Sequence, residues 1–171
     1  AKKAQHQVYI FGRLSNLVVR NGGLRGVVIL LHELHTIQVT DDTITAEAGA
    51  DLILVAEVAM EHGLTGLEWG AGIPGSVGGA VFMNAGAYGG QADMVVSSAT
   101  AIMPNGTIQT FLAEALDFGY RQSIFQENQG IIISATFCLT SDDQRAIKER
   151  MDDNNYRRAD KQPLNYPSNG S

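Results

Sequence analysis

Short apolar runs, separated by glycine and polar residues, fill the first 47 residues of the chain. The runs are QVYIF at 7–11, NLVV at 16–19, GVVILL at 26–31, TIQV at 36–39 and TITAEA at 43–48. Runs of this length, rich in β-branched residues and bounded by turn residues, are typical of strands. We therefore predict that short β-strands dominate this part of the chain.

The spacing of apolar residues becomes helical between Asp51 and His62. In the segment DLILVAEVAMEH, apolar residues stand at positions 52, 53, 55, 56, 59 and 60, and Gly63 follows them. Glycine is common directly after a helix because it adopts the left-handed conformation there without steric cost. These features predict an α-helix over residues 51–62.

The rest of the chain mixes both kinds of element. The runs at 93–103 and 106–111 flank the turn residues Pro104-Asn105-Gly106, which predicts a hairpin. GIIISATFCL at 130–139 predicts a further strand, with Cys138 as a buried thiol rather than a nucleophile.

A polar helix and a loop are expected at the C-terminal end. Ser141 and Gln144 have the spacing of a capping box, which predicts a helix from there toward Arg158. KQPLNYPSNGS at 161–171 is expected to be loop. Because the chain stops inside this turn-rich segment, and opens with what could be the tail of a helix, we expect it to be part of a longer protein.

The composition is that of a globular protein. The chain has 171 residues, 44% hydrophobic and 18% charged, which suits one domain or two small lobes with a core. The formal net charge of −6, with no lysine between Lys3 and Lys148, argues against nucleic acid as a partner. No signal peptide is evident, and the uncharged run at 69–92 is too rich in glycine and polar residues for a membrane helix. We expect a cytoplasmic protein without membrane insertion.

Residues 72–90, GIPGSVGGAVFMNAGAYGG, hold seven of the 19 glycines and no charged side chain. Three familiar motifs are excluded here. Gly70, Gly72 and Gly75 match G-x-G-x-x-G, with Asp93 further on, but no buried strand precedes them and more glycines interrupt the helix that should follow. A P-loop needs a lysine, and a nucleophile elbow around Ser76 would have Pro74 in place of its first glycine.

Two interpretations of the glycine cluster remain open. In the first, successive backbone amides point at a flat anionic ligand such as a dinucleotide diphosphate, which a second turn at Gly12–Asn16 grips from another side. In the second, the glycines only permit tight packing or turns. His32, Glu33 and His35 are interpreted as surface residues at a strand end, and no metal site is assigned.

Four ordered motifs resemble the UDP-N-acetylenolpyruvoylglucosamine reductase family of bacterial cell-wall synthesis. They are SNLVVRNGGLRGVVI, GLEWGAGIPGSVGGAVFMNAGAYGG, FGYRQSIF and KQPLNYPSNGS. The resemblance implies an α+β fold, the two-lobed FAD-binding module of the vanillyl-alcohol oxidase (PCMH) type. It also implies that NADPH reduces FAD and that the flavin then passes hydride to UDP-N-acetylglucosamine enolpyruvate, which gives UDP-N-acetylmuramate.

The resemblance also assigns roles to residues of this chain. Arg121 would lie near the substrate carboxylate and stabilise an enolate-like intermediate, to which Ser171 would donate a proton. Tyr120 and Lys161 would bind the substrate, Lys161 near its phosphates or the nicotinamide nucleotide. The residues expected to hold FAD are Gly12, Arg13, Leu14, Ser15, Asn16, Gly72, Ile73, Gly75, Ser76, Gly78, Gly79 and Val81.

The chain departs from the family pattern in two ways. The first phosphate turn of the family is close to Gly-Asn-Gly-Ser-Asn, whereas Arg13 and Leu14 stand in its middle here. A side chain at a position that needs a positive φ strains the backbone, and it crowds the diphosphate.

The family also continues into a substrate-binding domain with a catalytic glutamate. We therefore expect residues 1–31 to be part of a first FAD-binding lobe, 32–158 a second lobe and 159–171 the start of the substrate domain. We expect no turnover by this chain alone. An FAD-binding fragment without catalysis, or the FAD module of another oxidoreductase of this fold, remain the alternatives.

Overall fold

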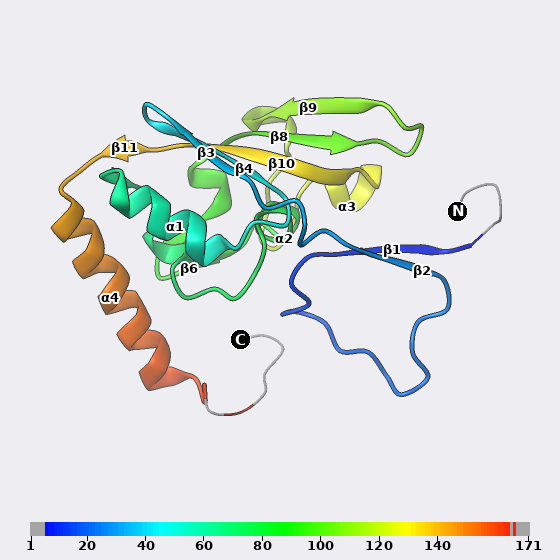
Figure 1. The fold of residues 1–171 in the computed structure, drawn as a ribbon, viewed down its shortest axis with the longest axis horizontal. Coiled ribbons are helices and arrows are strands. Elements are labelled where there is room, and N and C mark those ends of the chain that lie inside the picture. Colours follow the sequence, from blue (N-terminus) through cyan, green and yellow to red (C-terminus); the bar gives the residue numbers. More distant parts are fainter. Residues whose placement is uncertain (1–5, 165, 167–171) are drawn as a thin grey trace.

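The computed structural model describes residues 6–164 and 166 and is built around one five-stranded antiparallel sheet (Figure 1). The strand order is β3-β4-β10-β8-β9. The strands are β3 (Ile37–Thr40), β4 (Thr43–Glu47), β8 (Val96–Ile102), β9 (Ile108–Leu112) and β10 (Ile131–Cys138). Because β10 pairs with β4 on one side and β8 on the other, it joins the two hairpins into one sheet.

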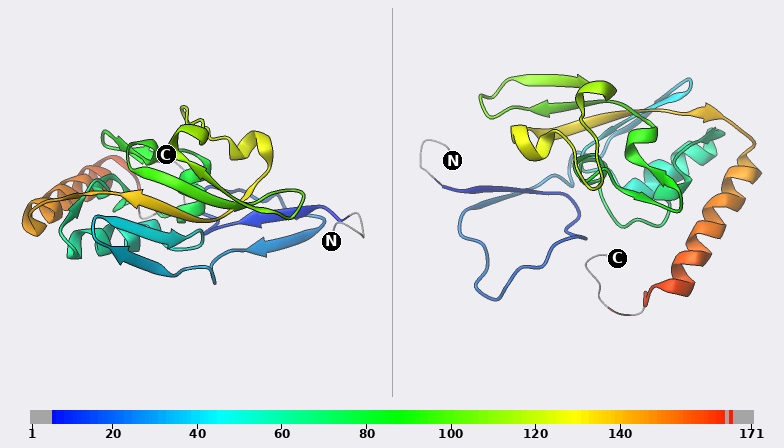
Figure 2. Two further views of the ribbon diagram at one scale, coloured as in Figure 1. Left: turned by 90° about the horizontal axis from the view of Figure 1, so that it is seen from above. Right: turned by 180° about the vertical axis from the view of Figure 1, so that it is seen from behind.

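Three two-stranded sheets surround this central sheet. β1 (Val8–Phe11) pairs parallel with β2 (Val27–Leu30), β5 (Leu64–Thr65) pairs antiparallel with β11 (Thr140–Ser141), and β6 (Gly86–Ala87) pairs antiparallel with β7 (Gly90–Gln91). All four residues of β2 are exposed. In each view of Figures 1 and 2, the β1–β2 pair and α4 lie at opposite ends of the molecule.

The helices are α1 (Leu52–Glu61), α2 (Val77–Phe82), α3 (Phe125–Asn128) and α4 (Gln144–Lys161). Single 3₁₀ turns are η2 (Glu68–Gly70), η3 (Ala92–Met94) and η4 (Ala113–Ala115). α2 packs against β10 and β4, and α4 packs against η2 and α1. In the part of the chain that the structure describes, no helix is both long and apolar enough to cross a membrane.

The core lies between the sheet and the helices α1 and α2. Its fully buried side chains include Ile44, Leu52, Val55, Val77, Val81 and Phe137. Burial of one such side chain contributes about 1.5–3 kcal/mol. The core therefore fixes both ends of α2, and with them the glycine-rich segment that surrounds this helix.

Several predicted elements are confirmed. The helix expected over 51–62 is α1, and Gly63 follows it with a φ of +66°. The hairpin around Pro104-Asn105-Gly106 joins β8 and β9, and the strand expected over 130–139 is β10. The run NLVV at 16–19, in contrast, forms no strand and lies in the loop that connects β1 to its parallel partner β2.

Two local predictions at the C-terminal end are wrong. The N-cap of α4 is Asp143, whose carboxylate accepts from the amides of Arg145 and Ala146, whereas Ser141 pairs with Leu64 in the β11–β5 sheet. Cys138 is exposed, because Phe137 faces the core and successive side chains of a strand point to opposite faces.

Candidate functional site

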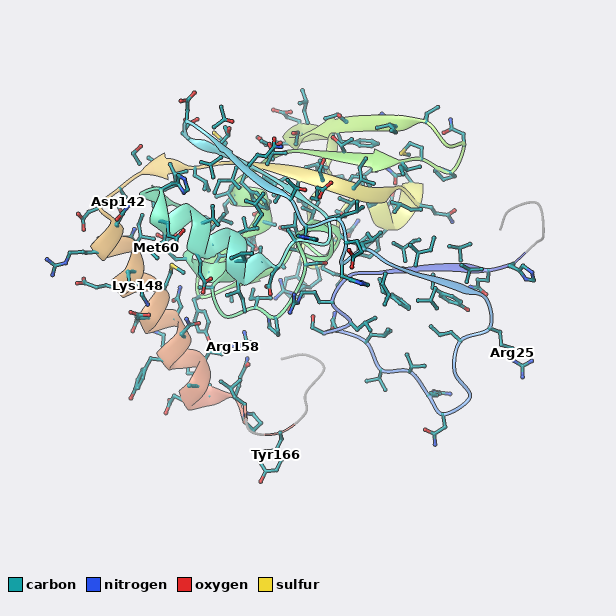
Figure 3. All side chains as sticks on the ribbon, viewed as in Figure 1. Arg25, Met60, Asp142, Lys148, Arg158 and Tyr166 are labelled. Atoms are coloured by element: carbon teal, nitrogen blue, oxygen red, sulfur yellow. The ribbon has the colours of Figure 1, made fainter. Side chains whose placement is uncertain are left out.

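One cavity of about 1500 Å³ lies where four distant segments of the chain meet. The segments are the loop after β1, the glycine-rich segment around α2, the turn before α3 and the C-terminal end of α4. Their lining residues include Gly12–Leu17, Ile73–Ser76, Gly78–Ala80, Gly86–Tyr88, Tyr120, Arg121, Arg158 and Lys161. Figure 3 shows Arg158 on the last turns of α4 and Tyr166 beyond its end.

The glycine-rich segment is tied to the loop that precedes α1. The Leu52 amide donates to the Gly75 carbonyl (3.0 Å), and the Val77 and Gly78 amides donate to the carbonyls of Ala50 (3.0 Å) and Ala48 (2.8 Å). Ser76 is the N-cap of α2, and its hydroxyl accepts from the Gly79 amide at 3.3 Å. These amides are therefore engaged within the protein, and the expected row of free amides is not present.

Packing explains some of the glycines, and the open cavity explains others. A Cβ on Gly78 would lie 2.9 Å from the Cβ of Ala48, and one on Gly90 would lie 2.4 Å from a Trp69 ring atom. Gly75 and Gly79 border the cavity, as Gly78 also does, and a Cβ on Gly75 would meet nothing closer than 3.8 Å. Tight packing thus accounts for some of these glycines, and others leave the cavity wall without side chains.

The turn at Gly12–Asn16 faces the glycine-rich segment across the cavity wall. A Cβ on Gly12 would lie 2.1 Å from the Ser76 hydroxyl, so this turn depends on a glycine at its first position. Leu14 has a φ of +59° although it is not glycine. A leucine in this left-handed conformation costs roughly 1–2 kcal/mol, so the turn keeps its shape under strain.

Cations gather around the cavity although the chain is acidic overall. Arg13, Arg121, Arg158 and Lys161 line it, and no aspartate or glutamate is among the lining residues. Only Arg13 has an ion-pair partner within the described residues, the Asp51 carboxylate at 3.0 Å. A cleft lined by charges of one sign concentrates ligands of the opposite sign, so the cavity is suited to an anion.

Arg121 and Tyr120 form one rim of the cavity. Arg121 has a φ of +56°, and its guanidinium donates from Nη1 to the Asn84 carbonyl (3.3 Å) and from Nη2 to the Gly86 carbonyl (3.2 Å). The guanidinium carbon also lies 5.1 Å from the centre of the Tyr120 ring, which is 89% exposed. The aromatic face and the cation are therefore both available to a ligand.

Arg150 anchors α4, which carries Arg158 and Lys161. Its guanidinium pairs with the carboxylates of Glu68 (2.9 Å) and Asp142 (2.6 Å), and it donates to Thr65 Oγ1 at 3.1 Å. Burial alone would raise the pKa of Glu68, but hydrogen bonds from Thr65, the Gly66 amide and Arg150 hold that pKa below its usual value. The hydrogen bond from Arg150 likewise lowers the pKa of Asp142.

Some predicted site residues lie away from the cavity. Val81 is fully buried on the core side of α2, and Gly72 lies under Asn155 and Arg158, where a Cβ would be 2.7 Å from Asn155 Oδ1. Ser171 lies outside the described residues. The histidine pair near β3 is exposed, and no metal-binding group of three or more His, Cys, Asp or Glu side chains occurs within residues 6–164 and 166.

The sequence also carried a signal for Arg158, which was not among the expected site residues. Arg158 and Lys161 are three residues apart, which places them on one face of α4. Arg158 is half-buried, and its Cδ lies 3.0 Å from where a Cβ on Gly72 would be. A half-buried guanidinium beside a glycine-rich loop is a second cationic contact for an anionic ligand.

These observations fit FAD. The wall formed by Gly12, Gly75 and Gly79 has no side chain that would obstruct a diphosphate, and the four cations offset its charge. Apolar residues such as Phe11, Ile73 and Leu52 line other parts of the cavity and can pack against flat ring systems. Leu14 lines the cavity beside this wall, and its side chain is the one expected to crowd the diphosphate.

Comparison with known proteins supports FAD as the cofactor. Residues 1–112 match the family model described as FAD binding domain. The chain is 70% identical over all 171 residues to a UDP-N-acetylenolpyruvoylglucosamine reductase of Leuconostoc mesenteroides, of which it covers 59%. It is 53% identical over 164 residues, 96% of the chain, to the protein of the same name from Levilactobacillus brevis, of which it covers 54%. The chain thus spans little more than half the length of these relatives.

Two solved structures show the same fold. The UDP-N-acetylenolpyruvylglucosamine reductase of Thermus caldophilus matches 94% of this chain and 59% of its own, with a TM-score of 0.80 and 30% identity. A cholesterol oxidase from Brevibacterium sterolicum matches 81% of this chain and 31% of its own, with a TM-score of 0.59 and 20% identity. The α+β FAD-binding fold of the vanillyl-alcohol oxidase type and the resemblance drawn from the four motifs are both confirmed.

Proposed function

This chain belongs to the family of FAD-binding domain proteins, and on that premise we propose that it is the cofactor-binding part of a flavin-dependent reductase of peptidoglycan precursor synthesis. The reaction is the NADPH-driven reduction of UDP-N-acetylglucosamine enolpyruvate to UDP-N-acetylmuramate. The observation that carries the proposal is the cavity itself, in which Arg121 and the glycine-rich segment share one cationic wall within an acidic chain.

The chemistry supplied by FAD, when bound, is the acceptance of hydride from NADPH and its delivery to the enolpyruvyl group. The residues of this chain bind and orient the reactants. The turn at Gly12–Asn16 and the segment at Gly75–Gly79 hold the diphosphate from two sides, and Arg158 provides a guanidinium for it. Lys161 contacts the phosphates of the substrate or of the nicotinamide nucleotide.

Arg121 acts on the enolpyruvyl carboxylate. Two of the five N–H donors of its guanidinium hold backbone carbonyls, which leaves the others available for the substrate. Its charge stabilises the negative charge that develops when hydride adds to the double bond; loss of one such partner costs about 2.7–4 kcal/mol of activation free energy. The proton that completes the reduction comes from Ser171, and the exposed Tyr120 ring packs against the substrate.

The domain division is part of the same proposal. Residues 1–31 contribute to a first FAD lobe, 32–158 form a second lobe, and 159–171 lead into a substrate-binding domain. An enzyme with this function is expected in the cytoplasm. α4 runs without a break across residue 158, so the third part begins within the last turn of a helix.

Two measurements test the proposal on the native protein that contains this chain. Purified protein is expected to show the absorption of oxidised flavin, and FAD at a hundred times its dissociation constant should stabilise the apoprotein by about 2.7 kcal/mol. NADPH oxidation should then depend on the enolpyruvyl substrate, and Arg121→Lys should lower the rate of substrate reduction without preventing flavin binding. Flavin binding without turnover would leave only an FAD-binding module, and absence of both would contradict the proposal.

A further inference from the structure

A buried polar cluster lies directly behind Arg121. Asn84 is 2% exposed, and its side-chain amide donates to Asp93 Oδ2 (3.1 Å) and to the Gly119 carbonyl (3.0 Å). Its side-chain oxygen accepts from the Asp93 amide at 3.0 Å. Both N–H donors of this amide, and its oxygen, therefore have a specific partner.

Asp93 determines which way the Asn84 amide points. Its Oδ2 atom accepts from Gln91 Nε2 (2.7 Å) as well as from Asn84, while its Oδ1 atom is buried without a hydrogen-bond partner. The main-chain N–H of Asp93 can only donate, so the oxygen of Asn84 must face it, and the nitrogen of Asn84 is left to face the carboxylate. The same nitrogen then reaches Gly119, the first residue of the turn that carries Arg121.

Asn84 also contacts the head of Arg121 through its main chain. Its carbonyl accepts from Nη1 of Arg121 (3.3 Å), and the carbonyl of Gly86 accepts from Nη2 (3.2 Å). Asn84 has a φ of +41°, in the left-handed region that asparagine adopts more readily than most residues but glycine adopts without cost. The side-chain bonds to Asp93 and Gly119 restrain this residue, and they orient the carbonyl toward the guanidinium.

The turn itself needs such support. Arg121 has a φ of +56°, and Gly119 and Gln122 exchange backbone hydrogen bonds of 3.1 and 3.2 Å across it. Gln126 Nε2 donates to the Arg121 carbonyl at 2.9 Å. Asn84 is thus bonded both to the start of the turn and to the far end of the side chain that the turn presents.

We propose that Asn84, oriented by Asp93, is a positioning residue that sets the direction of the Arg121 guanidinium in the cavity. The catalytic meaning of this inference rests on the proposed function, in which Arg121 binds the substrate carboxylate. A displacement of about 1 Å at a reacting group can lower a rate by about 10²-fold. Asn84 therefore acts on substrate reduction through Arg121, without touching the substrate itself.

The test uses Asn84→Gly in the native protein that contains this chain. Glycine tolerates the positive φ, so the variant removes the amide without adding backbone strain. Gln129→Gly is the matched control, because Gln129 also has a positive φ (+59°) and lies at the end of α3, outside the cavity lining. The first readout is the ¹⁵N NMR spectrum of the Arg121 guanidinium, assigned by its loss in Arg121→Ala.

In the native protein and in Gln129→Gly, restricted rotation about the Nε–Cζ bond should keep the Nη resonances of Arg121 separate. In Asn84→Gly they should merge. This readout needs no enzymatic activity, so it can fail or succeed independently of the proposed function. A single averaged resonance in the native protein would overturn the inference even if Asn84→Gly did not fold, and so would separate resonances in a folded Asn84→Gly.

The second readout is transient kinetics with each half-reaction measured alone. Asn84→Gly should reduce the rate of substrate reduction by about 10²-fold and leave flavin reduction by NADPH within about twofold. In an Arg121→Ala background, Asn84→Gly should have no further effect on substrate reduction, because residues that act as a unit are not additive. Equal losses in both half-reactions, or additive losses in the double variant, would show a merely structural role and overturn the inference.

Discussion

Gly12→Ala tests whether the two turns must touch for FAD to bind. The new Cβ would lie 2.1 Å from the Ser76 hydroxyl and 3.0 Å from the Ser76 Cβ, whereas ordinary contacts begin near 3.4 Å. Rotation of the Ser76 side chain could relieve the shorter contact, but the hydroxyl would then leave the Gly79 amide that it caps at 3.3 Å. Loss of such a cap costs about 1 kcal/mol of stability.

The contact with the Ser76 Cβ cannot be relieved by rotation, because that atom is attached directly to the backbone. The two turns must therefore move apart, and the diphosphate can no longer contact both. We expect FAD affinity to fall by at least about tenfold, which corresponds to about 1.4 kcal/mol. Flavin fluorescence titration of the apoprotein measures this affinity, and chemical denaturation measures the loss of the cap.

Gly22→Ala is the matched control, because a Cβ on Gly22 would meet nothing within 4 Å and its φ is not in the left-handed region. This variant should bind FAD and unfold as the native protein does. If Gly12→Ala bound FAD as tightly as Gly22→Ala and unfolded at the same denaturant concentration, the assignment of this wall of the cavity to the diphosphate would be refuted.

Three further substitutions or conditions have expected outcomes. Leu14→Gly should bind FAD more tightly in the same titration, because it removes the side chain that crowds the wall; weaker binding would contradict this. Its folding stability should change little, because relief of roughly 1–2 kcal/mol of backbone strain is offset by lost packing and by the chain entropy of glycine. Arg158→Gln should weaken FAD binding by about tenfold and make it less sensitive to salt, measured at two ionic strengths. The pKa values of Glu68 and Asp142 are lower in the folded protein than in the unfolded chain. Their pairing with Arg150 therefore stabilises the fold fully when the pH is above the unfolded pKa values, and this stabilisation is lost as the pH falls through the folded pKa values. Denaturation of the native protein should therefore show a loss of stability below about pH 4.5 that is smaller in Arg150→Met; equal losses would contradict the role of this anchor.

The local predictions succeeded where one periodicity decides the structure. The helix over 51–62 has an apolar stripe, an aspartate cap and a glycine stop, and each feature acts within a few residues of the others. The N-cap of α4 was misplaced because Ser141 and Asp143 are both good caps. The choice between them depended on the pairing of Ser141 with Leu64, which is distant along the chain.

The family motifs placed many residues at the cavity but did not explain why each is there. Gly78 and Gly90 belong to the same glycine-rich motif as Gly75, yet close contacts with Ala48 and Trp69 already leave no room for a side chain at either position. Within the motif all three look alike, because glycine has no side chain to reveal its partner. Asn84, in the middle of the same motif, gave no sign that it would hold the guanidinium of Arg121.

The sequence by itself determined α1, the β8–β9 hairpin, β10, the FAD-binding family and some of the residues that border the cavity, because these are encoded by local periodicity and by short motifs. Only the tertiary structure decided which residues meet: Gly12 against Ser76, Arg158 over Gly72, and Asn84 behind Arg121. These contacts join residues tens of positions apart, and their distances are set by how the core packs the helices onto the sheet. No pattern along the chain contains that information, because each partner is compatible with many others until the backbone is folded.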